Sequence, residues 1–209
     1  RTDAGPLNLS AIAGGTGGFV INGNSADARV GRTVSGIGDI NGDGLADIIV
    51  GAPGNTLGTN GAAYVIYGKS DNTNPVNLAN LASSQGFKIS GDATASYVGN
   101  TVSSAGDFNG DGFDDILTEG YIILGRANAG NISLASATNV FKVNGISSSG
   151  ISPTSFGDFN GDGLDDVVMG MPTSGRTYVI YGKTDANPIT LDASKNLTNS
   201  SMGFTINGA

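Results

Sequence analysis

Short apolar runs separated by polar turns repeat along the chain in a fixed order. Runs rich in Ile, Val and Leu directly follow an acidic loop at residues 47–50, 115–118 and 166–169. An aromatic-led run comes after each of them, at residues 64–67, 121–124 and 178–181. Apolar runs this short, bounded by Gly and Asp, are typical of strands, because helices need about ten or more residues. The pattern therefore predicts an all-β protein.

Two further segments complete each repeated unit. A Phe-led segment alternates apolar and polar side chains at residues 19–22, 87–90, 141–144 and 204–207. A weaker strand precedes each acidic loop, at residues 33–37, 101–105 and 152–156. Four short strands per unit, joined by turns rich in Gly, Asn and Asp, are typical of the blades of a β-propeller. A β-sandwich of the same strands is the alternative, but a sandwich does not require one loop to be copied three times.

The repeats also predict the domain organisation. We expect a single repeat region over residues 1–209, with about three four-stranded blades at residues 24–91, 92–145 and 146–208. Residues 1–23 are expected to form a linker and the outer strand of a preceding blade. The polar links at residues 72–85 and 184–200 each contain one Pro and are expected to be surface loops.

The acidic loop has the pattern D-x-N-x-D-G-x-x-D in all three copies. Side-chain oxygens at positions one, three and five fall on one side of a tight loop, and Gly at position six permits the sharp reversal. Position seven can supply its carbonyl while its side chain enters the core, and the Asp at position nine closes the shell. About six hard oxygen ligands in a flexible loop suit Ca²⁺ better than Mg²⁺. The sequence therefore predicts about three calcium sites, formed by Asp39, Asn41, Asp43, Leu45 and Asp47; by Asp107, Asn109, Asp111, Phe113 and Asp115; and by Asp158, Asn160, Asp162, Leu164 and Asp166.

The loop also has features of an ordinary turn and of an EF-hand. Asp, Asn and Gly are also ordinary turn residues, but three copies with the same ligand positions favour metal binding. An EF-hand needs Glu at position twelve, where this chain has Val50, Thr118 and Met169, so the loop is expected to join strands. The proposed ligands include half of the 18 acidic residues, whose mutual repulsion should open the loops without a cation. Asp114 and Asp165, at position eight, are expected to be solvated.

Composition excludes several classes of function. The chain has 35 Gly and no Cys, His or Trp, so disulfides, zinc sites with Cys or His ligands, and nucleophiles activated by His are impossible within it. Its net charge of −8, without a basic cluster, argues against nucleic acid. The sequence contains no run of 18 apolar residues, so it predicts no membrane-spanning helix. A glycosidase with two carboxylates is a weak alternative, since Glu119 is the one Glu present, and we expect no enzyme.

These residues resemble the FG-GAP repeat of integrin α-subunit β-propellers and of many bacterial surface proteins. The GAP element stands at residues 51–53 and 170–172 and is lost in the second unit, where the loop is shortened. The FG element stands at residues 30–31 and 98–99, with 149–150 as a weak third copy. The resemblance covers roughly residues 17–208 and implies a blade with Ca²⁺ in the loop between its first and second strands. In integrins such ions stiffen the propeller, on the face away from the ligand.

The resemblance and the loops together predict a calcium-stabilised, non-catalytic module for binding or adhesion, secreted or at the cell surface. Extracellular calcium is high enough to fill such sites, whereas cytosolic calcium is not. The ligand, a protein or a glycan, is not identified by the sequence. Three blades leave open edges, because closed propellers usually need at least four. We therefore expect a partial propeller or a piece of a longer one; the alternative is a structural subunit that self-associates through blade edges into an extracellular filament or sheath.

Overall fold

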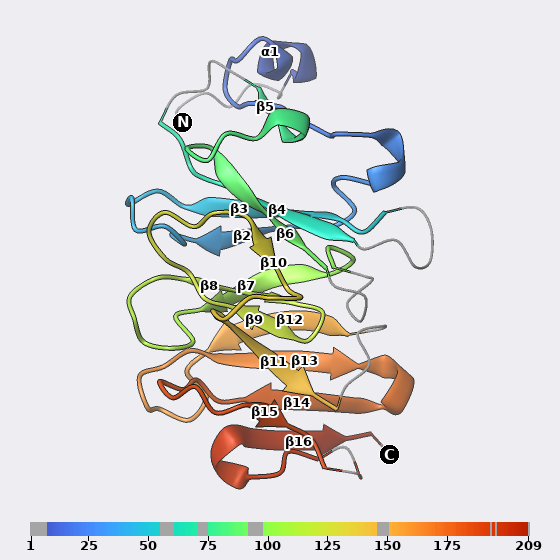
Figure 1. Cartoon of the computed structure of the whole chain (residues 1–209), viewed down its shortest axis with the longest axis vertical. Helices are drawn as coiled ribbons and strands as arrows, with labels where there is room; N and C mark the ends of the chain where they lie inside the picture. The colour runs from blue at the N-terminus through green and yellow to red at the C-terminus, as the bar shows by residue number, and fades with distance from the viewer. Residues whose placement is uncertain are drawn as a thin grey trace.

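The computed structural model describes residues 8–54, 61–70, 75–91, 98–145, 151–192, 194 and 196–208. Three four-stranded antiparallel units lie one above another as an open stack, with the N-terminal segment at one end (Figure 1). Their strands come in chain order, apart from short additional strands between the third and the fourth. The predicted all-β fold of propeller blades is confirmed. The weak third copy of the FG element, residues 149–150, lies outside the described residues.

Each blade is built from the four segments that the sequence repeats. Blade 1 consists of β2 (Val34–Gly38), β3 (Asp47–Ala52), β4 (Ala62–Ile66) and β6 (Gly86–Ser90). Blade 2 consists of β7 (Val102–Gly106), β8 (Asp115–Thr118), β9 (Tyr121–Ile123) and β11 (Val140–Asn144). Blade 3 consists of β12 (Ser152–Gly157), β13 (Asp166–Met171), β14 (Arg176–Ile180) and β16 (Gly203–Asn207).

Short parallel strands join each blade to the one before it. Strand β10 (Ile132–Ser133) of the second repeat pairs with β6 of blade 1, and β15 (Ile189–Thr190) of the third pairs with β11 of blade 2. In the same way, β5 (Val76–Asn77) pairs with β1 (Ile21–Asn22), a short strand that precedes blade 1 in the chain. The prediction that the polar links are surface loops was therefore wrong in part. Strands β5 and β15 lie within these links, and their backbones pair with neighbouring strands.

The helical elements in the described part of the chain are short. They are α1 (Leu9–Ala13), η1 (Ala26–Ala28), η2 (Leu78–Asn80), η3 (Pro172–Ser174) and η4 (Ser200–Met202). None of these described helices has the length and apolar character needed to cross a membrane.

The apolar cores lie between successive sheets. One face of blade 1, with Ile49 and Val65, packs on Ile116 and Ile123 of blade 2. A second core joins blades 2 and 3, and a third lies between blade 1 and the N-terminal segment. Both faces of blades 1 and 2 are therefore covered, which explains why their central strands are apolar runs without alternation. The recurring Tyr64, Tyr121 and Tyr178 are buried in these cores.

Candidate metal centre

The three acidic loops occupy equivalent places in the three blades. Each connects the first strand to the second, between β2 and β3, between β7 and β8, and between β12 and β13. Gly at positions four and six has a positive φ in every copy; for example, φ is +76° at Gly42 and +84° at Gly44. A residue with a Cβ rarely adopts this conformation, so the two glycines allow the chain to turn back on itself. The loops join strands, as predicted.

Within each loop, the side chains at positions one, three and five hold the backbone. Asp39 accepts hydrogen bonds from the N–H groups of Gly42 and Asp43 at Oδ1, and from Gly44 at Oδ2, over 2.7–3.1 Å. Asn41 Oδ1 accepts from the N–H of Asp43, and Asp43 Oδ1 accepts from the N–H of Leu45. The second and third loops show nearly the same network. One sequence pattern thus produces one backbone conformation three times.

The Asp at position nine is buried and fastens the loop to the blade. Asp47 accepts the N–H of Ile40 at 3.0 Å with one oxygen and that of Gly68, beyond β4, at 2.7 Å with the other. Asp115 and Asp166 make the equivalent bonds. Relative exposure is 1% or less at all three residues. This carboxylate therefore connects the start of its loop to the end of the third strand.

Burial raises the pKa of these three carboxyl groups. The pKa of Asp47 rises to about 6, mainly through desolvation, and the carboxylates of Asp43 and Asp39 raise it further. The pKa of Asp115 rises to about 7 for the same reasons, with its loop neighbours Asp111 and Asp107 contributing. The pKa of Asp166 is also raised, by burial and by Asp162. Hydrogen bonds from backbone N–H groups oppose the shift in every case. Each loop therefore concentrates negative charge beside a buried carboxylate.

The donor set fits a hard divalent cation. In the described part of the chain, no three acidic side chains converge on a common point as a preformed metal cluster, because several of their oxygens bind backbone N–H groups instead. A carboxylate has about four lone-pair sites and can accept an N–H and still bind a cation. The ligands would all be oxygen, and a bound cation would offset the repulsion among the loop carboxylates, which adds to the effect of burial on the pKa at position nine. The predicted ligand residues thus remain a proposal that the chemistry of the loops supports.

The prediction for position seven was wrong about the side chain. Leu45 is 39% exposed and does not enter the core of its own blade. Phe113 instead lies over loop 1, where a Cβ at Gly42 would be only 2.7 Å from its ring, and Leu164 lies in the same way over Gly110. In loops 2 and 3, position seven therefore packs on the loop of the preceding blade.

Position eight is also corrected, because Asp114 and Asp165 are bound between blades. Asp114 Oδ2 accepts the N–H of Asp39 at 2.8 Å, and Asp165 Oδ2 accepts the N–H of Asp107 at 2.9 Å. The backbone N–H of each returns a hydrogen bond to the carbonyl of the same residue. We call this pair of bonds the position-eight clamp. The recurrence of Asp at this position in two loops was the available signal, but its partner lies in another repeat.

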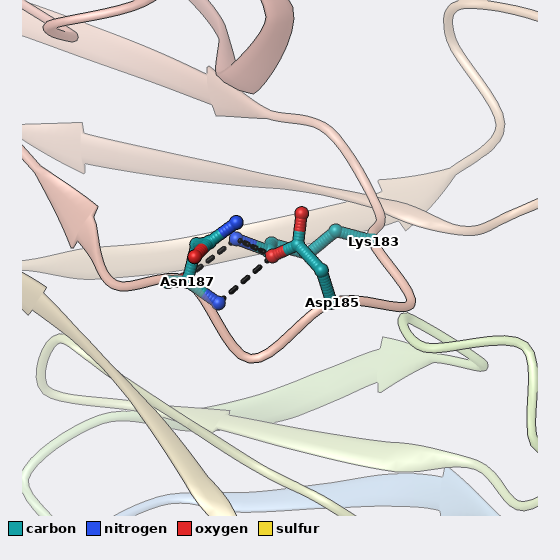
Figure 2. Close-up of polar contacts among 3 residues, drawn as sticks. All are labelled: Lys183, Asp185 and Asn187. Atoms are coloured by element: carbon teal, nitrogen blue, oxygen red, sulfur yellow. Dashed lines mark hydrogen bonds and ion pairs between the residues drawn. The ribbon is translucent and has the colours of Figure 1, made fainter.

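A basic residue beyond the third strand adds to the same interface. The N–H of Lys183 donates to the carbonyl of Phe108, and its ammonium lies 5.6 Å from the centroid of the Phe141 ring in β11. Figure 2 shows how Asp185 and Asn187 hold this side chain: Nζ is 2.7 Å from Asp185 Oδ1 and 2.6 Å from the carbonyl oxygen of Asn187. In blade 1, Lys69 lies over the ring of Phe19 in the same way, at 4.5 Å.

The repeat is shared with a known protein family. The FG-GAP repeat family matches residues 30–66, 98–134 and 154–191, together more than half of the chain. The chain therefore belongs to the FG-GAP repeat family, whose repeats form β-propeller blades.

Integrin α subunits are among its relatives. The chain is 28% identical to integrin alpha-V of Gallus gallus over 178 residues, which are 75% of this chain and 16% of that protein. It is 28% identical to integrin alpha-5 of Xenopus laevis over 165 residues, 72% of this chain and 14% of that protein. It is 34% identical to integrin alpha-M of Mus musculus over 104 residues, 47% of this chain and 8% of that protein. The chain thus spans less than a fifth of the length of these relatives, and it resembles the N-terminal propeller of integrin α subunits.

Proposed function

We propose that the chain is a calcium-stabilised, non-catalytic binding module that works outside the cell or at its surface. The observation that carries this proposal is the threefold recurrence of one oxygen-lined loop, each copy with a buried Asp at position nine. In relatives named integrins, the repeat belongs to adhesion receptors, which supports a role in binding a protein or glycan ligand. The position-nine carboxylates accept hydrogen bonds from the backbone, and the Asp side chains of each loop hold its conformation, which supports a structural role for these carboxylates.

The residues that would hold Ca²⁺ are the 15 predicted from the sequence. In loop 1, the side chains of Asp39, Asn41, Asp43 and Asp47 and the carbonyl of Leu45 would supply oxygen ligands. The ion would supply charge neutralisation, which keeps the loop closed on its blade. At calcium ten times above the dissociation constant, one site adds about 1.4 kcal/mol to the free energy of unfolding. Such weak sites fill at extracellular calcium concentrations, which is the argument for location.

Calorimetric titration with Ca²⁺ tests the proposal. About three sites are expected, and Asp43→Ala, Asp111→Ala and Asp162→Ala should each remove one of them and lower the melting temperature in calcium. Asp185→Asn is the matched control, because it removes an exposed carboxylate outside the loops and should keep all sites. If the unaltered chain gives no heat of binding on titration with Ca²⁺, or a stoichiometry near one, the assignment is refuted.

A filament-forming subunit is the second candidate, and one observation favours it. Phe159, Phe204 and Ile206 expose 54%, 45% and 52% of their surface at the C-terminal end of the stack. Exposed apolar side chains on an unpaired sheet mark an interaction surface. Sedimentation velocity with and without calcium distinguishes the candidates, since a filament elongates with concentration and a binding module stays monomeric.

A further inference from the structure

The basic residue beyond the third strand is held differently in the second repeat. In the third repeat, Lys183 lies over the ring of Phe141 and its ammonium pairs with Asp185 (Figure 2). Arg126 stands at the equivalent place beyond β9, and its backbone N–H donates to the carbonyl of Ile40 at 2.9 Å. Its guanidinium has no comparable partners, because it forms no ion pair and donates no hydrogen bond within the described residues.

Two features of the second repeat explain this difference. In the third repeat the carboxylate stands two residues after the cation, whereas the residue two places after Arg126 is the uncharged Asn128. The ring that Arg126 would cover belongs to Phe87, which is only 2% exposed and packs on Tyr67 with 6.1 Å between the ring centroids. The second repeat thus has a cation without the internal carboxylate that the third repeat supplies.

Arg126 lines a cavity with polar walls. The cavity has a volume of about 200 Å³, and hydroxyl and amide groups surround it, from Asn131, Ser133, Ser136, Thr138 and Asn139. Thr138 Oγ1 donates to Asn139 Oδ1 at 3.0 Å, whereas the hydroxyls of Ser133 and Ser136 bind no other group in the part of the chain that the structure describes. Pockets for drug-sized ligands have roughly 300–1,000 Å³, so this cavity suits one small polar unit.

A second polar cavity with its own cation shares a wall with the first. It has a volume of about 430 Å³ and is lined by Asn24, Tyr64, Asn80, Lys88 and Asn131, among others. Asn131 belongs to both cavities, and its Oδ1 accepts the backbone N–H of Lys88 at 2.9 Å. The Lys88 ammonium lies 6.0 Å from the centroid of the Tyr64 ring and pairs with no carboxylate among the described residues. Two cations therefore lie in neighbouring polar cavities, one on each side of Asn131.

We infer that the two cavities bind an acidic polysaccharide whose sugars carry carboxylates. The guanidinium of Arg126 would hold one carboxylate with two parallel hydrogen bonds, taking the place that Asp185 has beside Lys183. The ammonium of Lys88 would pair with the carboxylate of a further sugar along the chain. Hydroxyls and amides in both walls match the hydroxyl groups of a sugar, which an acidic peptide does not offer. The inference rests on the proposed function as a binding module and names the chemistry of one ligand.

Nuclear magnetic resonance titration of the full chain in saturating calcium tests the site. Glucuronate should shift the Arg126 Nε–H and Ser133 amide resonances, and glucose, which lacks the carboxylate, should not. A hyaluronate tetrasaccharide carries two glucuronates and should bind about tenfold or more tightly than glucuronate, because it reaches both cations. No shift with glucuronate, or an equal shift with glucose, overturns the inference. Tighter binding of a tetraglutamate peptide than of the tetrasaccharide overturns the assignment to a sugar.

Two variants separate the two cavities. Arg126→Gln should weaken the tetrasaccharide about tenfold or more and remove the preference for glucuronate over glucose. Lys88→Gln should weaken the tetrasaccharide alone and leave the glucuronate shift at Arg126 unchanged. Arg32→Gln is the matched control, because Arg32 is exposed and lines neither cavity. Tetrasaccharide affinity that Arg126→Gln leaves intact overturns the inference.

Calorimetric titration with Ca²⁺ distinguishes this inference from the proposed function. Arg126→Gln should keep all calcium sites and the melting temperature of the unaltered chain, since the residue is not a proposed calcium ligand. Intact calcium sites in a chain that does not bind glucuronate would overturn the sugar site alone. Glucuronate binding through Arg126 in a chain that binds no calcium would overturn calcium stabilisation and support the sugar site.

Discussion

Oε1 of Glu119 lies 2.6 Å from the backbone nitrogen of Thr101 and accepts its hydrogen bond. Oε2 accepts from the N–H of Gly99 and from the hydroxyl of Thr118. In blade 1, the corresponding N–H of Gly31 donates to the carbonyl of Gly51, in the GAP element. Blade 2 has lost that element, and the buried Glu119 side chain takes over the role of the missing backbone acceptor.

Replacement of Glu119 should therefore destabilise blade 2. Glu119→Ala leaves the N–H groups of Gly99 and Thr101 buried without their acceptor and opens a cavity, so we expect a loss of about 2–4 kcal/mol in the free energy of unfolding. Glu119→Gln keeps the size and one acceptor oxygen, and should cost about 1–2 kcal/mol. Urea denaturation measures both. An Ala variant as stable as the unaltered chain would contradict this role.

The clamp also explains why Gly precedes the first Asp of loops 1 and 2. Gly38 has φ +68°, and a Cβ there would overlap the Asp114 carboxylate at 2.0 Å. Gly44 has a similar φ of +84° but nothing within 4 Å of its Cβ position. Both Ala variants bear the strain of a positive φ, about 1–2 kcal/mol. We expect Gly38→Ala to cost at least about 1–2 kcal/mol more than Gly44→Ala by thermal denaturation, because overpacking is added.

A double-mutant cycle separates the two contributions. Asp114→Ala removes the overlapping carboxylate, so Gly38→Ala should be less harmful in that background than in the unaltered chain. The same cycle with Gly44→Ala should be additive. Equal coupling for the two glycines would mean that the cost of Gly38→Ala has another cause.

The sequence could predict what one repeat determines by itself. The order of strands, the loop between the first two strands and the shortened second unit all follow from residues that are close in the chain. Periodicity and turn chemistry are local signals, and each occurs three times in the chain, which distinguishes a repeated blade from a chance turn.

The sequence could not predict what two repeats determine together. Asp114 contacts Asp39, 75 residues away, and nothing near Asp114 distinguishes a clamp from a solvated carboxylate. Phe113 looks like a core residue of its own blade until the stacking of blades is known. The parallel pairing of β5 and β15 was missed because each is two residues long and lies in a polar, Pro-containing link. Contacts between repeats thus account for most of the corrections.

Without calcium, stability should fall as pH rises. An unfolded Asp has a pKa of about 3.9, whereas the folded pKa is about 6 for Asp47 and about 7 for Asp115. A raised folded pKa means that the folded state binds more protons, so this contribution is fully present below pH 3.9 and is lost as pH rises through 6 and 7. We expect the melting temperature in chelator to be higher at pH 5 than at pH 8.

Calcium and one substitution provide the controls for this pH dependence. Saturating Ca²⁺ should reduce the difference between pH 5 and pH 8, because the ion favours the ionised carboxylates and competes with protons. Asp115→Asn removes the group with the higher folded pKa and should flatten the profile in chelator. A profile that is unchanged by Asp115→Asn would assign the pH dependence to other groups.

The clamp should also connect calcium affinity to the stacking of blades. Asp114 fixes the backbone of Asp39, a proposed ligand in loop 1, and Asp165 does the same for Asp107 in loop 2. Loop 3 has no such support among the described residues, and Phe159 within it is 54% exposed. A loop that is already ordered loses less conformational entropy when it binds an ion. We therefore expect loop 3 to bind Ca²⁺ most weakly.

Calorimetry on variants with single loops disabled can rank the three sites. Asp162→Ala should remove the weakest site and leave the two tighter ones. Asp114→Ala should weaken the loop 1 site by about three- to tenfold, because a partner that positions a ligand commonly changes affinity by about a factor of ten. The loop 3 site should be unaffected, since Asp114 does not contact it. A uniform loss of affinity at all three sites would instead indicate general destabilisation, which the melting temperature of Asp114→Ala at saturating calcium would reveal.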